Sequence, residues 1–317
     1  SGEVKLAETG RTDSTIIAML YKDTDDSTVQ HRKPDYIARV NAKGKFRFRN
    51  LSAGIYKLYA LKDNDGGKTY NTRAELLAFN DSAIVLKDSV SAIQMFAYAE
   101  VKEEKKGAAS VKSLPEKKLK LTTSLENSQQ GILDSLKIIF NRKIKSYDQE
   151  KFLLTDTLFN KIEKTHFSID STGKIFTIYT PWKEDTKYNL LIDKTAITDT
   201  LNDQLTKTDS ISFKTKKEAD YGHILLRFLN LDTAAHPVLQ FVKNEQLYKS
   251  VPVTAATWSD KLFEPGEYEL RILFDHNRNG KWDPGNYAEK KQPETAITLD
   301  QKLTIKANWD NERDIKL

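Results

Sequence analysis

The chain has 317 residues, and at roughly 100–200 residues per domain this length predicts two or three domains. Only 38% of the residues are hydrophobic and 30% are charged, which is typical of several small domains with much surface. The 14 Phe, 13 Tyr and 4 Trp are enough to build cores and exclude a disordered chain. The absence of cysteine excludes disulfides, thiolate zinc sites, iron–sulfur clusters and cysteine nucleophiles. The net charge of +5 is spread along the chain, so it does not form a nucleic-acid footprint.

The beginning of the chain is already strand-like in sequence. It opens with Ser1-Gly2-Glu3-Val4, and no signal peptide is visible within it. No stretch approaches ~18 consecutive apolar residues, the length that spans a bilayer. We therefore expect a trimmed segment of an exported protein, whose export signal or lipid anchor lies outside this sequence.

Strand patterns dominate the first hundred residues. Runs of β-branched and apolar residues between Gly, Asn and Asp turns predict strands over 15–21, 36–40, 45–49, 55–61, 84–86 and 93–101. The run Lys45–Arg49 alternates with period two, which puts Phe46 and Phe48 on one face. Such short strands with frequent turns predict an all-β sandwich.

Two charged connectors divide the rest of the chain. Residues 102–120 are rich in Lys and Glu, and residues 215–220 read TKKEAD. Between them, strands are predicted at 135–140, 152–154, 166–169, 174–179, 188–192 and 210–214, with a hairpin turn at Asp170-Ser-Thr-Gly173. The predicted domains are 1–112, 113–217 and 218–317. No long helix is predicted, and the lack of βαβ alternation argues against a nucleotide-binding α/β enzyme.

An internal repeat relates the first and last parts of the chain. Gly54-Ile-Tyr56-Lys-Leu58 matches Gly266-Glu-Tyr268-Glu-Leu270, with an offset of 212 that also pairs Tyr70-Asn71 with Trp282-Asp283. Each copy reads as a strand followed by a loop rich in Asp, Asn and Gly. The repeat predicts that the first and third domains share one fold.

These residues also carry a family resemblance. Phe46-Arg-Phe48, Leu51-Ser-Ala-Gly54-Ile-Tyr56-Lys-Leu58 and Glu264-Pro265-Gly266-Glu-Tyr268 resemble the signature of carboxypeptidase-regulatory-like, transthyretin-like β-sandwiches. In the middle domain, Leu136-Lys-Ile-Ile-Phe140, Asp185-Thr-Lys-Tyr188 and Ile197-Thr-Asp199 resemble the bacterial Ig-like domain. The resemblance implies an all-β chain of three consecutive sandwiches: transthyretin-like, Ig-like and transthyretin-like.

The whole arrangement is similar to cell-surface lipoproteins of a gram-negative lineage, in which a lipid-anchored Ig-like domain usually comes first. Domains of this kind support adhesion, display and scaffolding and rarely catalyse. Fold-level analogy does not establish a function.

The loop after the second copy of the repeat has the spacing of a calcium site. Calcium takes six to eight oxygen ligands, and oxygen side chains recur here with Gly280 at the sharp turn. The candidate ligands are Asp275, Asn277, Asn279, Lys281 through its carbonyl, Asp283 and Asn286. Because the last position is Asn, Glu289 is an alternative ligand. The competing interpretation is an Asn/Gly-rich loop held by its own Asx turns. The first copy, with Asp63, Asp65 and Asn71, has fewer oxygens and is a weaker candidate.

The tripeptide Asp-Ser/Thr-apolar or Asp-Ser/Thr-Thr recurs along the chain and resembles the O-glycosylation acceptor of the same lineage's exported proteins. The competing interpretation is turn chemistry, with Asp in the turn and Ser or Thr entering a strand. An attached glycan would indicate an extracytoplasmic protein. The candidate acceptors are Ser14, Ser27, Ser82, Ser89, Ser135, Thr157, Ser171, Thr200, Ser210 and Thr233.

Three of the 4 tryptophans, Trp258, Trp282 and Trp309, lie in the third domain. Exposed rings could stack on sugars, which defines a carbohydrate-binding alternative; the competing interpretation is packing in the core and loops. The 5 histidines are scattered without metal-ligand spacing, and neither a Gly-x-Ser-x-Gly elbow nor a phosphate-binding glycine loop is present. No catalytic residue is therefore predicted.

The sequence predicts a non-enzymatic, exported protein of the bacterial envelope, at the cell surface or in the periplasm. It would act as a spacer, a scaffold or a docking module for an envelope protein that the sequence does not name. Calcium is the one cofactor expected, and a lipid anchor outside this sequence is the one membrane attachment.

Overall fold

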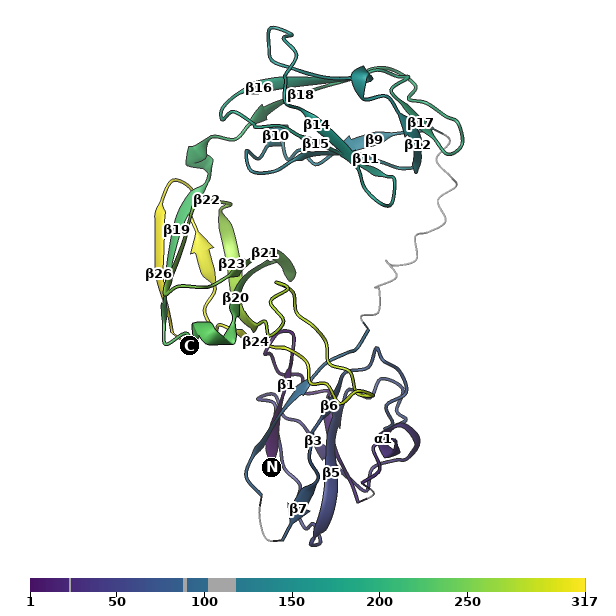
Figure 1. The fold of residues 1–317 in the computed structure, drawn as a ribbon, viewed down its shortest axis with the longest axis vertical. Helices are drawn as coiled ribbons and strands as arrows, with labels where there is room; N and C mark the ends of the chain where they lie inside the picture. Colours follow the sequence, from purple (N-terminus) through teal and green to yellow (C-terminus); the bar gives the residue numbers. More distant parts are fainter. Residues whose placement is uncertain (23, 88–89, 102–117, 317) are drawn as a thin grey trace. The chain divides into compact units, whose positions relative to one another are not determined.

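The computed structural model describes residues 1–22, 24–87, 90–101 and 118–316. Strands contain 46% of the residues and helices 4%, so the prediction of an all-β, multi-sheet sandwich protein is confirmed (Figure 1). Contacts group the chain into two compact units, whose described parts are residues 1–101 with 223–316, and residues 118–222. The first and last sandwiches therefore belong to one unit. Among the described residues, no helix has the length and apolar character needed to cross a bilayer.

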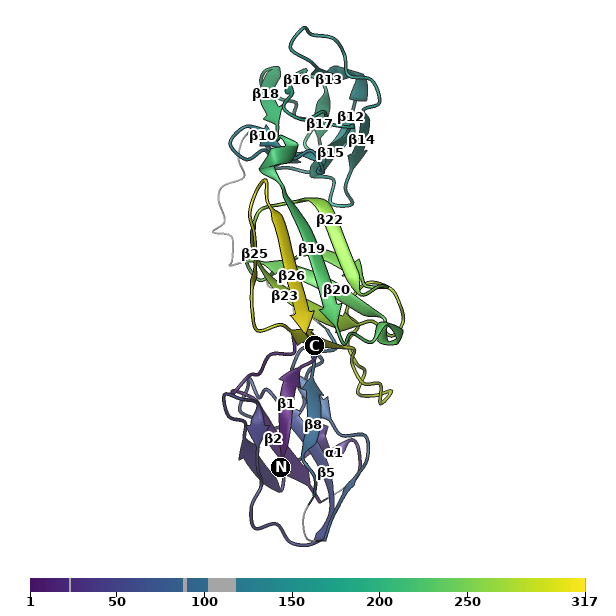
Figure 2. The same ribbon diagram turned by 90° about the vertical axis from the view of Figure 1, so that its left-hand side faces the viewer.

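The first sandwich packs a three-stranded sheet against a five-stranded sheet. The strand orders are β4-β1-β8 and β3-β2-β5-β6, with β7 also beside β5. The strands are β1 Gly2–Leu6, β2 Ile17–Tyr21, β3 Tyr36–Arg39, β4 Lys45–Phe46, β5 Gly54–Leu61, β6 Leu77–Phe79, β7 Ile84–Leu86 and β8 Ile93–Ala97, with a one-turn helix α1 at Thr28–His31. Strands β1 and β8 run parallel, side by side (Figure 2). The prediction of a strand over Lys45–Arg49 was wrong beyond Phe46.

The third sandwich repeats this topology strand for strand. Its sheets are β22-β19-β26 and β21-β20-β23-β24, with β25 beside β23, and β19 and β26 again run parallel. The strands are β19 Gly222–Leu229, β20 Pro237–Lys243, β21 Gln246–Pro252, β22 Thr257–Phe263, β23 Gly266–Phe274, β24 Thr295–Thr298, β25 Leu303–Ile305 and β26 Asp310–Lys316. The same fold in the first and third sandwiches follows from the repeated strand β5/β23, which lies at the centre of the larger sheet in both.

The middle sandwich forms the second unit. Its sheets are β10-β18-β16-β13, β14-β15-β11-β9 and the pair β12-β17. The strands are β9 Leu121–Thr123, β10 Gln129–Gln130, β11 Leu136–Phe140, β12 Ile144–Tyr147, β13 Phe152–Thr155, β14 His166–Ile169, β15 Ile175–Tyr179, β16 Lys187–Ile192, β17 Ile197–Asp199 and β18 Asp209–Thr215. The predicted hairpin turn between β14 and β15 is confirmed, with Gly173 at φ 70°. The hydroxyl of Thr172 and backbone N–H groups hold the pKa of Asp170, in this turn, at about 2.

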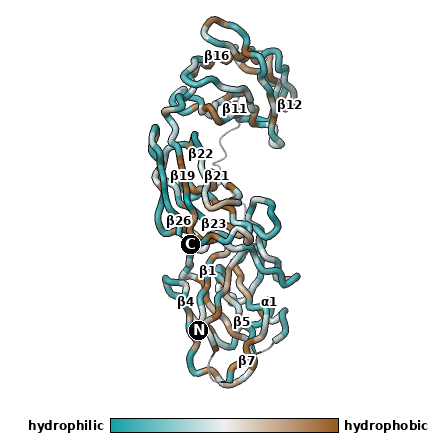
Figure 3. Tube along the Cα trace, turned by 60° about the vertical axis from the view of Figure 1, so that its left-hand side comes forward, coloured by the Kyte–Doolittle hydropathy of each residue, from teal (hydrophilic) through white to brown (hydrophobic). Residues whose placement is uncertain are grey.

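Each sandwich encloses its own apolar cluster, as the alternation of hydrophobic and hydrophilic residues along the strands indicates (Figure 3). A further cluster joins two sandwiches. Tyr287, from the loop between β23 and β24, packs with Tyr59, Tyr70, Phe79 and Tyr98 of the first sandwich. This cluster explains why residues far apart in sequence form one compact unit.

Candidate functional site: two Asp/Asn loops and a clamp

The loop that follows β23 is closed by its own hydrogen bonds. Asp275 is 2% exposed, and its carboxylate accepts the N–H of Gly280 at 2.7 Å and that of Asn279 at 3.2 Å. Asp283 Oδ2 accepts the side-chain amides of Asn277 at 2.5 Å and Asn279 at 2.6 Å. Two carboxylates thus hold both ends of the turn together. Gly280 has φ 77°, a left-handed conformation that favours glycine.

Glu294 is a member of this loop that the sequence interpretation missed. Its side chain is 7% exposed and accepts the N–H of His276 at 2.8 Å and that of Asp283 at 3.1 Å. Its backbone carbonyl accepts Trp282 Nε1 at 2.7 Å. This buried carboxylate accepts the N–H groups of two residues near the beginning and the end of the loop, and it thereby orders the loop.

The structure brings together four of the six predicted calcium ligands, namely Asp275, Asn277, Asn279 and Asp283. The N–H of Lys281 bonds Asn279 Oδ1 at 2.7 Å. Asn286 belongs to a separate turn, in which it pairs with Lys291 through the main chain and its side chain accepts the N–H of Glu289. Neither Asn286 nor Glu289 joins the loop's hydrogen bonds.

The chemistry of the loop fits the Asx-turn interpretation directly. The oxygens expected to face an ion instead accept N–H groups of the loop. In the part of the chain that the structure describes, no group of three or more His, Cys, Asp or Glu side chains is placed to hold a metal. Calcium binding by this loop stays a prediction, and the buried acid beside the loop is Glu294.

The first sandwich carries the same loop in the same conformation. Asp63 accepts the N–H of Lys68 at 3.3 Å, as Asp275 accepts that of Gly280. Lys68 has φ 58°, close to the φ of Gly280. Glu75, 5% exposed, accepts the N–H of Asn71 at 2.9 Å, as Glu294 accepts that of the corresponding Asp283, and it also accepts the N–H of Thr72 at 3.2 Å.

One pair of side chains is exchanged between the two loops. In the first sandwich Asn71 Nδ2 donates to Asp65 Oδ2 at 2.8 Å, whereas in the third Asn277 donates to Asp283. Asp65 corresponds to Asn277, and Asn71 to Asp283. The amide–carboxylate hydrogen bond is retained although its two partners have changed places, so this bond is what the loop requires.

The repeat is interrupted by an insertion directly after this pair. Leu61 pairs with Leu77 across the sheet, and Leu273 pairs with Ala296, so the offset rises from 212 to 219. Seven residues are therefore inserted between Asp283 and Glu294. We call residues 284–293 the clamp loop, because they extend from the third sandwich to the first (Figure 1, yellow-green).

Tyr287 is the centre of the clamp loop. Its ring is 4% exposed and makes edge contacts with Tyr59, Tyr70 and Phe79, at centroid distances of 5.9, 6.0 and 5.3 Å. Its hydroxyl donates to the carbonyl of Asp26 at 2.5 Å and lies 2.9 Å from the Tyr59 hydroxyl. Burial raises the pKa of Tyr287 above its ordinary value, so the ring stays neutral. An aromatic ring with a satisfied hydroxyl is a strong anchor between two surfaces.

Three further contacts surround this ring. Glu100 accepts the N–H of Tyr287 at 2.9 Å. Lys290 Nζ lies 4.0 Å from the ring centroid of Tyr287 and pairs with Asp26 Oδ1 at 2.9 Å. Gln292 donates to the carbonyl of Phe79 at 3.1 Å. Partial burial opposes the charge on Asp26, but hydrogen bonds from Lys290 and Lys57 outweigh it and hold the pKa of that carboxyl below its ordinary value.

The tryptophans named in the sequence analysis have different surroundings. Trp258 is half-buried against Phe241, at a centroid distance of 5.3 Å, and Trp282 is half-buried in the loop. Trp309 is 61% exposed, with Lys306 Nζ at 4.7 Å from its ring. Of these three rings, Trp309 alone offers an open face for stacking on a sugar.

The predicted O-glycosylation acceptors are mostly at the surface. Eight of them are exposed, Ser135 is half-buried, and Ser89 lies outside the described residues. Several of the preceding aspartates also form the Asx turns of the competing interpretation. Asp156 accepts the N–H of Leu158, and Asp232 accepts that of Ala234, at 2.8 and 2.9 Å. Turn chemistry thus explains these aspartates, and glycosylation stays a prediction.

Neither a family model nor a curated protein matches the chain. Native alpha-2-macroglobulin from Escherichia coli, over domains MG0-NIE-MG1, is 12% identical, with 58% of this chain and 72% of that one covered and a TM-score of 0.28. BcpA, the major pilin subunit of Bacillus cereus, is 13% identical over 99% of this chain and 98% of that one, with a TM-score of 0.22. SGBP-B of Bacteroides ovatus, solved with a mixed-linkage heptasaccharide, is 9% identical over 99% and 67%, with a TM-score of 0.19. At these TM-scores the similarities carry no argument about this chain.

Proposed function

We propose that this chain is a non-enzymatic segment of an exported bacterial surface protein, which spaces, displays or docks a partner in the envelope. The observation that supports it is the contact of the clamp loop with the first sandwich, which holds the first and third sandwiches as one unit. Tandem β-sandwiches joined only by linkers move relative to one another by default. A spacer or scaffold needs a fixed geometry, and the clamp loop provides one at the cost of only seven inserted residues.

Contacts outside the clamp loop support the same proposal. The N–H of Ala296 donates to the carbonyl of Ala7 at 2.8 Å, and the hydroxyl of Thr298 bonds the carbonyl of Thr9. Arg11 pairs with Glu269, a residue of β23. The first sandwich is therefore fastened to β23 and β24 as well as to the loop between them, and this restricts rotation about any single contact.

The finer parts of the proposal come from the sequence. Surface glycosylation at the exposed Ser and Thr acceptors and a lipid anchor outside this chain would place the segment at the outer membrane. The first and third sandwiches would be transthyretin-like and the middle one Ig-like. Calcium, if bound by the Asp275 loop, would stiffen the base of the clamp loop rather than act on a substrate.

Spin labels test the mechanical part of this proposal. The chain lacks cysteine, so cysteines at exposed Lys43 and Lys261 would label one site in each sandwich. We expect a narrow distance distribution in the parent chain and a broad one after Tyr287→Ala. A broad distribution in the parent would contradict a fixed spacer. Protease treatment of intact cells that carry the full protein would test the surface location, and resistance there with cleavage after lysis would contradict it.

Carbohydrate binding is the second candidate function, and the exposed ring of Trp309 favours it. Stacking on a sugar would quench tryptophan fluorescence, and Trp309→Ala would abolish the quenching. The half-buried Trp258 provides the matched control, because its substitution should leave any quenching by oligosaccharides in place. If no oligosaccharide of a broad panel quenches the tryptophan fluorescence, carbohydrate binding is contradicted.

A further inference from the structure

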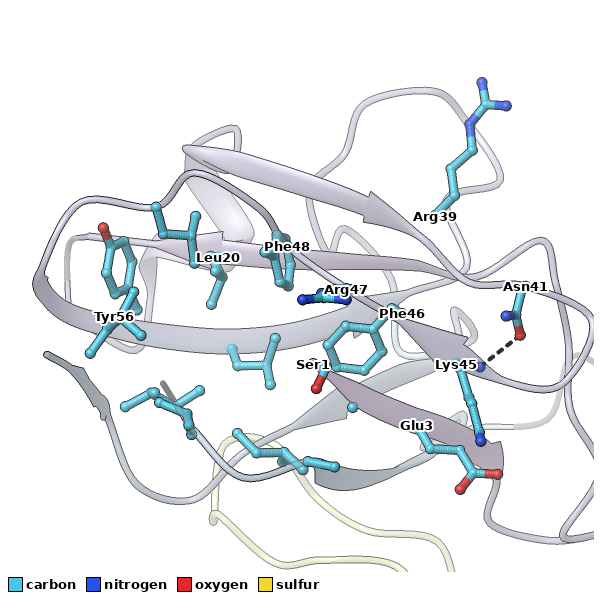
Figure 4. A pocket seen from close by; sticks show the side chains of 18 of the residues that line it. Ser1, Glu3, Leu20, Arg39, Asn41, Lys45, Phe46, Arg47, Phe48 and Tyr56 are labelled. Carbon is cyan, nitrogen blue, oxygen red and sulfur yellow. Dashed lines mark hydrogen bonds between the residues drawn. The ribbon is translucent and has the colours of Figure 1, made fainter. Parts of the chain in front are cut away.

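Apolar side chains that are not fully buried lie in a hollow in the first sandwich and on a projection in the middle one. In the first sandwich the half-buried ring of Phe48 points into a hollow of the surface (Figure 4). In the middle sandwich Leu158 and Phe159 lie on the turn that follows β13, and each is 78% exposed. No other large hydrophobic side chain in the described part of the chain is as exposed. We call these two residues the apolar tip.

The apolar tip is held by a tight hairpin turn. Asp156 and Asn160 close this turn, because the N–H of Asp156 donates to the carbonyl of Asn160 at 3.1 Å. The Asp156 carboxylate accepts the N–H of Leu158 at 2.8 Å and that of Asn160 at 2.9 Å, and the Asp156 carbonyl accepts the N–H of Phe159 at 3.2 Å. The side-chain amide of Asn160 is the main reason why the pKa of Asp156 lies below its ordinary value, so this carboxylate stays ionised. The two apolar side chains are therefore presented on an ordered turn.

Phe159 occupies the position of this turn that least suits its side chain. A three-residue hairpin loop places its last residue in the left-handed region, where glycine is the usual residue. Phe159 has φ 61° there. The other residues with positive φ in the described chain, apart from glycines, are all polar or charged, such as Asn202 and Asn244. A bulky apolar residue in this conformation is strained, and strain of this kind clusters at functional sites.

The fold gains little from the apolar tip. Neither Leu158 nor Phe159 belongs to the apolar cluster that forms the core of the middle sandwich. Asparagine at position 159 would relieve the strain and remove exposed apolar surface, and both changes favour the isolated folded chain. A contact outside the chain therefore explains the two side chains better than a role in the fold does.

We propose that the apolar tip inserts into the interface of a lipid bilayer. The N–H groups of Leu158, Phe159 and Asn160 are all bonded within the turn. Entry into an apolar medium leaves none of these donors without a partner, which is the condition that hydrocarbon imposes on a backbone. A protein partner would be recognised through a rim of free donors and acceptors around an apolar centre, and these three N–H groups are not free to supply one.

Two lysines near the base of the turn suit lipid headgroups. Lys187 lies two residues before Asn189, the partner of Thr155 at the end of β13, so the register places it beside the turn. Lys164 follows the turn, beside the exposed Glu163. Both lysines are exposed, neither has a carboxylate partner within the described residues, and side chains of this length can extend to lipid phosphates. Because Glu163 offsets one of the two charges, we expect the apolar layer to supply most of the binding.

The experiment measures co-sedimentation of the whole chain with phosphatidylcholine vesicles. We expect the parent chain to partition into the vesicle fraction, and Phe159→Asn to weaken this partition about tenfold, because it removes the larger of the two apolar side chains. Leu158→Asn, which leaves residue 159 unchanged, should also weaken it. The matched control is Leu201→Asn, which removes another exposed apolar side chain (64%) from a turn closed by Asp199 and should leave partition unchanged.

A fluorescent label tests where the apolar tip lies in the bilayer. The chain lacks cysteine, so Thr157→Cys, at an exposed position, accepts one nitrobenzoxadiazole label. Its emission should brighten and shift to the blue with vesicles, and lipids that carry a nitroxide on the acyl chain should quench it. Quenching only by nitroxides in the aqueous phase would contradict insertion.

Thermal denaturation separates a contact role of Phe159 from a structural one. Asparagine suits the left-handed conformation, so Phe159→Asn should keep or raise the melting temperature of the middle sandwich while it loses vesicle binding. A lower melting temperature would show that Phe159 serves the fold and would overturn the proposal. So would the absence of vesicle binding by the parent, or undiminished binding by both tip variants. Self-association without lipid, removed by Phe159→Asn in a chain that binds no vesicles, would assign the tip to a second copy instead.

The apolar tip lies in the middle sandwich, whereas the clamp loop joins the first and third sandwiches. Failure of vesicle binding would therefore leave the proposed scaffold function standing, and a broad spin-label distribution would leave the membrane contact standing.

Discussion

The first and third sandwiches have the same strand order and the same Asp/Asn loop, but they differ in the length of one loop and of one strand, among other places. The third sandwich has seven extra residues after its loop, and these form the clamp loop that enters the first sandwich. The first sandwich has a short second sheet, whose strand β4 contains two residues where β22 contains seven. One copy has gained a contact outside its framework, and the other has a shorter strand inside its framework.

This comparison shows where a β-sandwich tolerates change. The insertion lies in a loop, beyond the hydrogen-bonded register of β23 and β24, so it disturbs no strand pairing. Asp283 and Glu294 hold its two ends, since both belong to the loop's hydrogen-bond network. A rigid base then lets Tyr287 reach its site without the entropy cost of ordering a long free loop.

The largest expected effect is a loss of stability when the contact between the clamp loop and the first sandwich is removed. Tyr287→Ala removes a buried aromatic ring and should destabilise the unit of the first and third sandwiches by about 3–5 kcal/mol. Chemical denaturation of this unit, followed apart from that of the middle sandwich, should change from one transition to two, because the first and third sandwiches would unfold separately. Tyr287→Phe is the matched control and should cost only about 0.5–1.5 kcal/mol, the value of one hydrogen bond. One unchanged transition in the alanine variant would show that other contacts couple the sandwiches.

Substitutions of the two buried glutamates, Glu75 and Glu294, should differ in how much of the surrounding chain they affect. Glu75→Ala and Glu294→Ala each leave two backbone N–H groups without their carboxylate, at about 1–3 kcal/mol. We expect similar losses of stability by thermal denaturation. Only Glu294→Ala should also expose the clamp loop to proteolysis, because that loop is anchored at Glu294. Equal protease sensitivity of the two variants would show that the insertion is held by its own contacts and not by its base.

The exchanged pair predicts a compensating swap. Asn277→Asp alone would place two carboxylates against each other and should cost about 1 kcal/mol through the lost hydrogen bond. The double variant Asn277→Asp with Asp283→Asn copies the first loop and should recover to within about 0.5 kcal/mol of the parent.

Calcium titration of the same variants tests the metal prediction. The single variant should gain more thermal stability from millimolar calcium than the parent does, because a ligand that binds only the folded state stabilises it. If EDTA lowers the melting temperature of the parent as well, the parent loop itself binds the ion.

The smallest expected effect is the loss of stability at low pH when Asp65 of the first loop is protonated. The N–H of Gly67, and then the amide of Asn71, hold the pKa of Asp65 below its ordinary value. A lowered pKa in the folded state gives stability that is present above the unfolded value of about 3.9 and is lost as the pH falls through the folded one. An NMR titration of Asp65 should therefore have its midpoint below that value. The third loop has the non-titrating Asn277 at this position, and Asp65→Asn should remove the transition.

Much of the fold was predictable because strand signals are local. Residues 84–86 and 166–169 were predicted as strands with the bounds that β7 and β14 have. The three-residue strands β6 and β17 were missed. The run Lys45–Arg49 has ideal alternation, yet only its first two residues pair, with Glu3 and Gly2 of β1.

For the candidate site, the sequence determined the repeat, the turn chemistry of its loops and the residue types that fold each loop onto itself. These properties depend on residues a few positions apart, which a pattern can show. Only the tertiary structure decided that Glu294 completes the loop and that Tyr287 enters an aromatic cluster in the first sandwich. The physical reason is that their partners lie beyond an insertion or about 200 residues away, where no local pattern connects them.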